Sequence, residues 1–356
     1  RAAMAFSGRT RVEDNFFQNF LIRDTFPNAP QGMIPMLYPG DDLFGPSYIP
    51  NWAMWFILEL EEYATRRGHP EVLEAARSKV YSLCEFFEQY LNEYGLLENL
   101  SSWVFVEWSH ANDLVQDVNF PTNMLYAEML VAIGRMYHDS DLTDRAAILR
   151  HTIREWSYNG EFFEDNAVRG DNGVLKSTGE CTEVCQYYAF FSNTAAPETH
   201  PELWKKIVEE FTPDRTARGA YPEIWPANVW PGGYRRYEIL SRIGLSKQLM
   251  NEIVATFYPM TLMTTTLWEN LDISASCDHG FGATLAFIFF RDILGVRDID
   301  LEERKVLISM KDFGLEWCRG TIPVGDGNIE FQWALKPDGY FDYTISVPEG
   351  FIFEEL

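Results

Sequence analysis

A single glutamate, Glu269, has an unusual sequence context. It ends the run 264–269, Thr-Thr-Thr-Leu-Trp-Glu, in a loop expected between two helices. An apolar loop that is rich in hydroxyl groups can tune the pKa of a carboxylate for work as a general base. The alternative is a surface acid that pairs with a nearby backbone amide. Glu269 is the strongest candidate for a catalytic residue in the chain.

A histidine, His279, follows in the run 276–282, Ser-Cys-Asp-His-Gly-Phe-Gly. The glycines allow close backbone approach, and a helix is expected to start here. The imidazole of His279 could hydrogen-bond a hydroxyl group of a ligand. The alternative is a histidine at a helix terminus that is bonded to Asp278 and has a structural role only.

Further acids stand beside aromatic residues in predicted loops. Glu107 and Trp108 end the apolar run 103–108, Trp-Val-Phe-Val-Glu-Trp, and Asp42 lies in the run 38–42, Tyr-Pro-Gly-Asp-Asp. An acid beside a tryptophan can combine a hydrogen bond to a hydroxyl group with ring stacking. For Glu107 the alternative is one exposed acid at the edge of a strand.

Aromatic residues make up 15% of the chain, with 11 Trp, 17 Tyr and 26 Phe. Most of these rings are expected in the core, but the C–H faces of sugars also stack on aromatic rings. Trp52 opens an expected helix, and Trp225 and Trp230 lie in the run 223–234. The last two could form an aromatic wall, and packing explains them equally well.

Acids in aromatic loops suit glycoside hydrolysis, which needs two carboxyl groups at the scissile bond. This chemistry uses no metal or cofactor, so none is expected. Other chemistries lack their motifs: there is no glycine-rich phosphate loop with a lysine, no Gly-x-Ser-x-Gly and no His pair at metal-ligand spacing. The stereochemical course, retaining or inverting, is open at this point.

Charge and composition exclude some classes of partner. The formal net charge is −24, which disfavours nucleic acid, and no apolar run of about 18 residues suggests a membrane span. Hydrophobic residues make up 46% and charged residues 23%, as in an ordinary globular protein. The first residue is Arg1 and no signal-peptide pattern follows, so we expect a processed or truncated start.

The elements that must position these residues are mainly helices. Apolar residues recur at helical spacing in about ten stretches, mostly joined in pairs by short turns. The stretches are 2–21, 51–67, 70–91, 119–138, 141–157, 179–192, 200–211, 231–244, 246–256 and 279–294. The long loops between them are 22–48, 96–118, 158–178, 213–230 and 258–278. This alternation predicts a toroid of helical hairpins, with the loops gathered at one end as a cleft.

The pattern changes to short strands after Gly295. They are expected at 305–309, 316–322, 328–335 and 340–347, where polar and apolar residues alternate in part. Residues 337–339, Pro-Asp-Gly, form a strong hairpin turn. We therefore expect two domains: a helical catalytic domain at 1–298, and a small antiparallel β-sandwich or sheet at 299–356.

Four runs resemble motifs of the bacterial α-L-rhamnosidases of glycoside hydrolase family 78. Residues 48–52, Tyr-Ile-Pro-Asn-Trp, resemble Y-V-P-x-W, and 105–108, Phe-Val-Glu-Trp, resemble F-x-D-W with Glu for Asp. Residues 265–269 resemble T-T-x-W-E, and 276–282 resemble S-x-N-H-x-x-x-G with a shorter spacing to the glycine. The resemblance extends from the first helix to the C-terminal strands. It implies an (α/α)6 six-hairpin barrel followed by a β-sandwich.

The same resemblance implies a function and roles for the candidate residues. Glu269 would be the general base that activates water in an inverting mechanism, and the partner would be a glycoside or oligosaccharide that carries terminal α-L-rhamnose. No nucleic acid, membrane or cofactor is implied. The candidate substrate-binding residues are Trp52, Glu107, Trp108, His279, Asp42 and Trp230.

One departure concerns the second carboxyl group. In the family, the general acid lies in a D-C-P-x-R-E-x-x-G-W-x-x-D stretch before the helix that residues 1–6 resemble, and that stretch is absent here. We therefore expect an N-terminally incomplete toroid and a truncated form with little activity alone. The alternatives are another (α/α)6 glycosidase, a polysaccharide lyase with a Tyr or His base, or a non-catalytic rhamnose-binding relative.

Overall fold

The computed structural model of the chain describes residues 11–356 apart from 24, 27–28, 38–47 and 68–69. The chain divides into two compact units, which are described separately. The helical unit comprises Gln18–Glu62 and Glu71–Ile239. The C-terminal unit comprises Arg1–Phe17, Tyr63–Pro70 and Leu240–Leu356. The predicted domain boundary at 298/299 stays a prediction.

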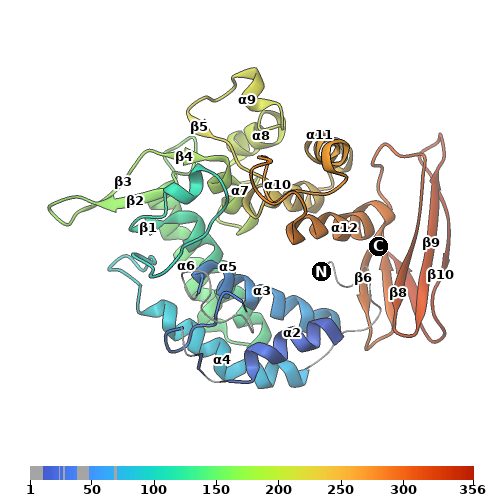
Figure 1. Cartoon of the computed structure of the whole chain (residues 1–356), viewed down its shortest axis with the longest axis horizontal. Coiled ribbons are helices and arrows are strands. Elements are labelled where there is room, and N and C mark those ends of the chain that lie inside the picture. The colour runs from blue at the N-terminus through green and yellow to red at the C-terminus, as the bar shows by residue number, and fades with distance from the viewer. Residues whose placement is uncertain (1–10, 24, 27–28, 38–47, 68–69) are drawn as a thin grey trace. The chain divides into compact units, whose positions relative to one another are not determined.

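Helices dominate the helical unit (Figure 1), and most predicted helices are confirmed within a few residues. Three of these helices, α3, α4 and α10, also have residues that belong to the C-terminal unit. The helices are α3 (Pro50–Arg67), α4 (Pro70–Glu88), α5 (Phe120–Tyr137), α6 (Ser140–Ser157), α7 (Glu183–Phe191), α8 (Pro201–Glu209), α9 (Arg215–Arg218) and α10 (Gly232–Arg242). Within the described residues, no helix is both long and apolar enough to cross a membrane.

Helix α5 is the central helix of this unit, because nearly all its side chains are buried. The side chain of Asn119 accepts a hydrogen bond from the backbone N–H of Thr122, which caps the helix N-terminus. His138 ends the helix in the left-handed conformation, with φ 56°. Asp139 then caps α6, so a two-residue connection turns the chain back on itself and makes one helical hairpin.

Five short strands of the helical unit were not predicted, and most of them lie in segments that were predicted to be loops. Strands β1 (Val118–Asn119), β2 (Asn166–Arg169) and β3 (Leu175–Ser177) form an antiparallel sheet. Strand β4 (Cys181–Thr182) pairs in parallel with β5 (Ile224–Trp225). The prediction of continuous loops was wrong at β2, β3 and β5, whereas β1 spans the predicted boundary between loop and helix at 118/119, and β4 stands at the start of the predicted helix 179–192. Strands this short show no alternation of polar and apolar residues, and most of their partners are distant in sequence.

Two predicted helices differ in the C-terminal unit. Helix α11 (Ser246–Thr264) runs eight residues beyond its predicted end at 256, through Pro259. The buried side chains of Phe257 and Met260 on both sides of the proline offset the hydrogen bond that it removes. The predicted helix 279–294 is divided into η2 (Gly280–Ala283), α12 (Thr284–Ile288) and the π-helical turn η3 (Phe289–Leu294). Helix α2 (Arg11–Leu21) is the described part of the predicted helix 2–21.

The C-terminal strands form two sheets. One has the order β10–β9–β8 and is antiparallel, and the other has the order β11–β7–β6. The bounds are β6 (Val296–Asp300), β7 (Lys305–Ile308), β8 (Trp317–Val324), β9 (Gly327–Leu335), β10 (Phe341–Ser346) and β11 (Ile352–Glu355). The four predicted strands are confirmed, while β6 and β11 were not predicted. Strand β11 runs parallel to β7, unlike the other pairs here.

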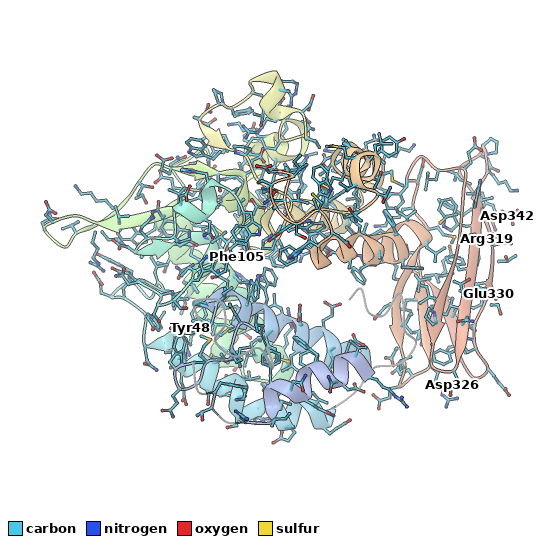
Figure 2. The ribbon with its side chains drawn as sticks, in the orientation of Figure 1. Tyr48, Phe105, Arg319, Asp326, Glu330 and Asp342 are labelled. Atoms are coloured by element: carbon cyan, nitrogen blue, oxygen red, sulfur yellow. The ribbon has the colours of Figure 1, made fainter. Side chains whose placement is uncertain are left out.

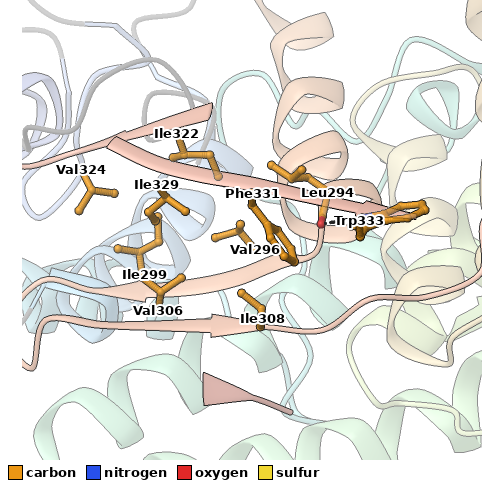
Figure 3. Close-up of a cluster of buried hydrophobic side chains, with 10 residues drawn as sticks. All are labelled: Leu294, Val296, Ile299, Val306, Ile308, Ile322, Val324, Ile329, Phe331 and Trp333. Carbon is orange, nitrogen blue, oxygen red and sulfur yellow. Dashed lines mark hydrogen bonds between the residues drawn. The ribbon is translucent and has the colours of Figure 1, made fainter. Parts of the chain in front are cut away.

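A cluster of buried apolar side chains lies between these sheets (Figure 3). Its members come from η3, β6, β7, β8 and β9: Leu294, Val296, Ile299, Val306, Ile308, Ile322, Val324, Ile329, Phe331 and Trp333. The indole N–H of Trp333 lies 3.0 Å from the carbonyl oxygen of Leu294. In the β10–β9–β8 sheet, alternate residues are exposed on the face that points away from this cluster, among them Arg319, Glu330 and Asp342 (Figure 2).

Candidate functional site

The loop 267–279 in the C-terminal unit brings Glu269 and His279 together. The backbone N–H of Glu269 donates to the Ser276 carbonyl at 2.9 Å, and that of His279 donates to the Leu267 carbonyl at 3.1 Å. These bonds pair the two ends of the loop like a hairpin. As a result, Nε2 of His279 lies 3.9 Å from Oε1 of Glu269. The sequence singled out both residues, and the structure places them side by side.

The hydrogen bonds of His279 determine which ring nitrogen faces the glutamate as a donor. The backbone N–H of Phe281 donates to Nδ1 of His279 at 3.2 Å. A neutral imidazole has one donor and one acceptor nitrogen, so Nε2 carries the proton when the ring is neutral. Its N–H therefore lies on the side of the Glu269 carboxylate. The separation of 3.9 Å exceeds hydrogen-bond length, so the contact is electrostatic.

Glu269 is held by the loop and remains accessible. Its Oε2 accepts a hydrogen bond of 3.3 Å from the backbone N–H of Ser276. The side chains of Glu269 and His279 are 20% and 30% exposed. A carboxylate with one oxygen anchored and the other beside an imidazole can accept a proton from water or bind a hydroxyl group.

The threonines before Glu269 build the loop. Helix α11 ends at Thr264, and Thr265 caps it in the left-handed conformation, with φ 63°. The indole N–H of Trp268 donates to the Thr264 hydroxyl at 2.7 Å, and the Thr266 hydroxyl donates to the carbonyl of Cys277. Trp268 is buried. The Thr-Thr-Thr-Leu-Trp run therefore positions Glu269.

Gly282 secures the other side of this loop. A Cβ atom at Gly282 would lie 2.6 Å from Cβ of Leu267, closer than such atoms approach in proteins. Only glycine allows the first turn after His279 to pack this closely on the residue two positions before Glu269. The glycine in the predicted motif is therefore explained by packing.

An aromatic cluster in the helical unit contains two more predicted residues. The ring of Trp52, at the start of α3, lies 6.4 Å from that of Phe105 at an interplanar angle of 83°. Phe105 (labelled in Figure 2) also contacts Trp108, with ring centroids 4.8 Å apart. Oδ1 of Asn51 accepts the backbone N–H of Phe105 at 3.1 Å, which ties this segment to α3. Trp108 is 38% exposed and could contact a ligand.

Glu107 is fully buried. Its Oε2 accepts the backbone N–H of Asn228 at 2.7 Å, and its Oε1 accepts that of Gly233 at 2.6 Å. Burial raises its pKa to about 7, although these hydrogen bonds act in the opposite direction. A carboxyl group with no exposed surface and both oxygens bound cannot reach a sugar hydroxyl. The structure thus argues against the predicted substrate contact and assigns Glu107 to anchoring the start of α10.

Trp230, another predicted residue, is not accessible to a ligand. Trp230 is only 2% exposed, and its ring packs against that of Tyr234 at 5.7 Å, so the structure argues against its predicted contact with a sugar. Its neighbour in the same run, Trp225, is 45% exposed. Asp42 lies outside the described residues. The pattern of residues along the run does not show which of its tryptophans is buried.

Buried acidic residues that the sequence analysis did not single out also shape the helical unit. Asp165 is buried and accepts hydrogen bonds from the backbone N–H and the hydroxyl of Thr182, and burial raises its pKa to about 8. Glu183 pairs with Nε of Arg215 at 2.5 Å. Both acids fix loops of the unit. Among the described residues, no group of three or more His, Cys, Asp or Glu is arranged to hold a metal ion.

Glu269 and His279 belong to the C-terminal unit, whereas Trp52 and Trp108 belong to the helical unit. The Glu269–His279 pair is the candidate catalytic site. The prediction that Trp52, Trp108 and His279 bind the terminal sugar on which Glu269 acts stays a prediction.

Comparison with known proteins finds likenesses to rhamnosidases. No family model matches the chain. The α-L-rhamnosidase of Alteromonas sp. (strain LOR) is 30% identical over 105 residues, which are 26% of this chain and 11% of that protein. The GH78 family rhamnosidase of Bacillus sp. GL1 superposes with a TM-score of 0.73 and 20% identity, over 87% of this chain and 33% of that one.

Two further solved structures that superpose on this chain are also rhamnosidases. The α-L-rhamnosidase of Dictyoglumus thermophilum has a TM-score of 0.64 and 15% identity, over 95% of this chain and 38% of that one. A rhamnosidase of Klebsiella oxytoca with rhamnose bound has a TM-score of 0.54 and 14% identity, over 72% of this chain and 50% of that one. The chain thus spans between a third and a half of these solved relatives.

These likenesses confirm the resemblance that the sequence motifs indicated, as well as the predicted fold class. The chain has the fold of the family 78 rhamnosidases, a mainly α, (α/α)6 six-hairpin toroid followed by a small C-terminal β region.

Proposed function

We propose that the protein is a glycoside hydrolase that removes terminal α-L-rhamnose from glycosides or oligosaccharides, with Glu269 as the general base of an inverting mechanism. The observation that carries the proposal is the pairing of Glu269 with His279 at 3.9 Å in a chain that has the rhamnosidase fold. The activities by which these four relatives are named support the substrate class, since all are rhamnosidases.

In this mechanism Glu269 takes a proton from a water molecule as that water attacks the anomeric carbon. The bond to the leaving-group oxygen breaks in the same step, and that oxygen receives a proton from a second carboxyl group. The family motif that carries this carboxyl group is absent from this sequence, so we expect little activity from this chain alone, and the variants are compared at that low level. The Ser276 amide fixes Oε2 of Glu269, which leaves Oε1 as the basic atom. The Nε2–H of His279, on the same side, donates to a hydroxyl group of the sugar.

The test uses p-nitrophenyl α-L-rhamnoside as substrate. Glu269→Gln keeps the size of the side chain and removes its basicity, so we expect kcat to fall by about 10²–10⁴-fold. Asp278→Asn is the matched control, because it removes an exposed carboxylate from the same loop. Its activity should stay within about twofold of the unmodified protein if only the Glu269 carboxylate takes the proton.

The stereochemistry tests the rest of the proposal. An inverting enzyme releases β-L-rhamnose first, which proton NMR of the anomeric hydrogen detects before mutarotation. Small anions such as azide should partly restore turnover in Glu269→Ala and give a β-linked product. First release of α-L-rhamnose would contradict inversion. Undiminished turnover in Glu269→Gln would exclude Glu269 as the base. Sugar binding without any release would favour a non-catalytic rhamnose-binding protein.

A further inference from the structure

Trp225 is an exposed tryptophan whose ring is nevertheless fixed. It is 45% exposed, yet its ring packs on the imidazole of His110 with centroids 4.1 Å apart. Its indole N–H donates to Oε2 of Glu180 at 3.0 Å. Its backbone pairs with Thr182 in the β4–β5 ladder. The indole ring is therefore fixed by the strand pairing of its backbone, by the hydrogen bond to Glu180 and by the contact with the His110 ring.

The loop that carries Trp225 is tied to the loop that carries His110. The side-chain amide of Asn228 donates to the Trp108 carbonyl at 2.8 Å, and its backbone N–H donates to the buried Glu107 carboxylate. His110 is held in turn by Asp113 at 3.1 Å. The helical unit thus presents two exposed indole rings, Trp108 and Trp225, on two joined loops. All the residues named in this arrangement belong to the helical unit.

A fixed and exposed aromatic ring is suited to stacking on a sugar. Pyranose rings have an apolar C–H face, and an immobile indole can cover it without losing side-chain entropy on binding. Glu180 uses only one carboxylate oxygen for Trp225 in the described contacts, so the other can accept a hydrogen bond from a sugar hydroxyl. The carboxylates of Glu180 and Asp113 flank the pair of rings, and they disfavour a negatively charged uronate here.

We propose that Trp225, backed by His110 and flanked by Glu180, is the stacking platform of a carbohydrate-binding subsite for a neutral pyranose residue of the glycan. The subsite is additional to the site of the terminal sugar and does not require catalysis by Glu269.

The experiment measures binding by isothermal titration calorimetry with ligands that are not hydrolysed. The probes are L-rhamnose, an S-linked α-L-rhamnosyl-glucoside and an S-linked α-L-rhamnosyl-galacturonide. Trp225→Ala should weaken binding of the glucoside about tenfold, because one aromatic stacking contact is lost. Binding of L-rhamnose alone should change less than twofold, if the monosaccharide occupies another site. Trp225→Tyr should retain most of the affinity, since a ring is kept.

The control is Trp317→Ala, which removes a tryptophan that is 65% exposed on β8 and should leave every affinity unchanged. Glu180→Gln keeps an acceptor for the indole N–H but removes the charge, so it should narrow the preference for the glucoside over the galacturonide. Equal glucoside affinity for Trp225→Ala and the unmodified protein would overturn the proposal. So would an equal loss for all three probes, or equal losses in Trp225→Ala and Trp225→Tyr. These results rest on the proposed rhamnoside substrate class but not on catalysis, so a protein that binds the probes without hydrolysing rhamnosides would give the same binding pattern.

Discussion

Glu269 and Glu107 each stand next to a tryptophan in the sequence, and the structure gives them opposite environments. Glu269 is accessible, with one oxygen anchored by an amide and the other beside His279. Glu107 is sealed in the helical unit, with both oxygens bound by backbone amides and a pKa raised to about 7. Accessibility rather than sequence context thus separates the candidate base from the structural acid.

The origin of the partners explains the difference. Ser276 and His279 come from within ten residues of Glu269, so a short loop alone creates its surroundings. Asn228 and Gly233 come from 121 and 126 residues beyond Glu107. A Cβ at Gly232 would lie 2.7 Å from Oε1 of Glu107, so glycine is needed for the approach of this distant segment.

Removal of each carboxylate should separate activity from stability. Glu269→Ala should lower kcat by about 10²–10⁴-fold and leave the free energy of unfolding within about 0.5 kcal/mol. Glu107→Ala leaves two buried N–H groups without acceptors and should cost about 3 kcal/mol of unfolding free energy. Activity assays and urea unfolding of both variants check this. A large loss of stability in Glu269→Ala would break the comparison.

The raised pKa of Glu107 should make stability depend on pH. Its folded-state pKa of about 7 lies above the ordinary value of 4.5, so between these pH values the folded state holds a proton that the unfolded state has lost. The stability contributed by Glu107 is therefore greatest at low pH and declines as the pH rises towards 7. We expect a change of roughly 2 kcal/mol between pH 5 and 7.

The measurement is the difference in unfolding free energy between the unmodified protein and Glu107→Gln, which cannot titrate. This difference cancels the titration of groups that the two proteins share. It should fall as the pH rises through this window. A difference that is constant with pH would show that Glu107 has the same pKa in the folded and unfolded states.

Alanine substitutions at two glycines test how the loop that carries Glu269 is held in place. Of the predicted losses of stability, this one is the smallest. Gly282→Ala places a Cβ 2.6 Å from the Leu267 side chain and should cost about 1 kcal/mol of stability. Leu267 lies two residues before Glu269, so a shift of Leu267 should also displace the Glu269 carboxylate and lower the activity of Gly282→Ala. Gly280→Ala is the control, since a Cβ there meets no atom within 4 Å. Equal unfolding midpoints and equal activities for the two variants would contradict this account.

Local patterns predicted much of the fold. The helical periodicity of 51–67 and 119–138 gave α3 and α5, and the Pro-Asp-Gly turn gave the β9–β10 hairpin. Strands β4 and β5 could not be predicted, because each is two residues long and the pair is separated by about 40 residues of chain. The end of α11 was predicted too early because a proline usually ends a helix. Here the helix continues through Pro259, since the buried side chains on both sides of it stabilise the helical conformation.

The candidate site was predictable only where its contacts are local. Glu269 and His279 lie on one short loop, so both their identity and their proximity follow from residues 264–282. The burial of Glu107 and Trp230 depends on packing between distant segments, to which a pattern along the chain is blind. The same limit applies to Trp225, whose exposure and contact with His110 appear only in three dimensions.

The hydrogen bond from Trp333 to the Leu294 carbonyl has a consequence for protein engineering. Leu294 ends the π-helical turn and also belongs to the apolar cluster between the two sheets. Strand β9 is therefore hydrogen-bonded to the segment that precedes β6. A truncation just before β6 would remove Leu294 from the apolar cluster and expose the core between the sheets. A transplant of this β region onto another scaffold should carry the turn 289–294 with it.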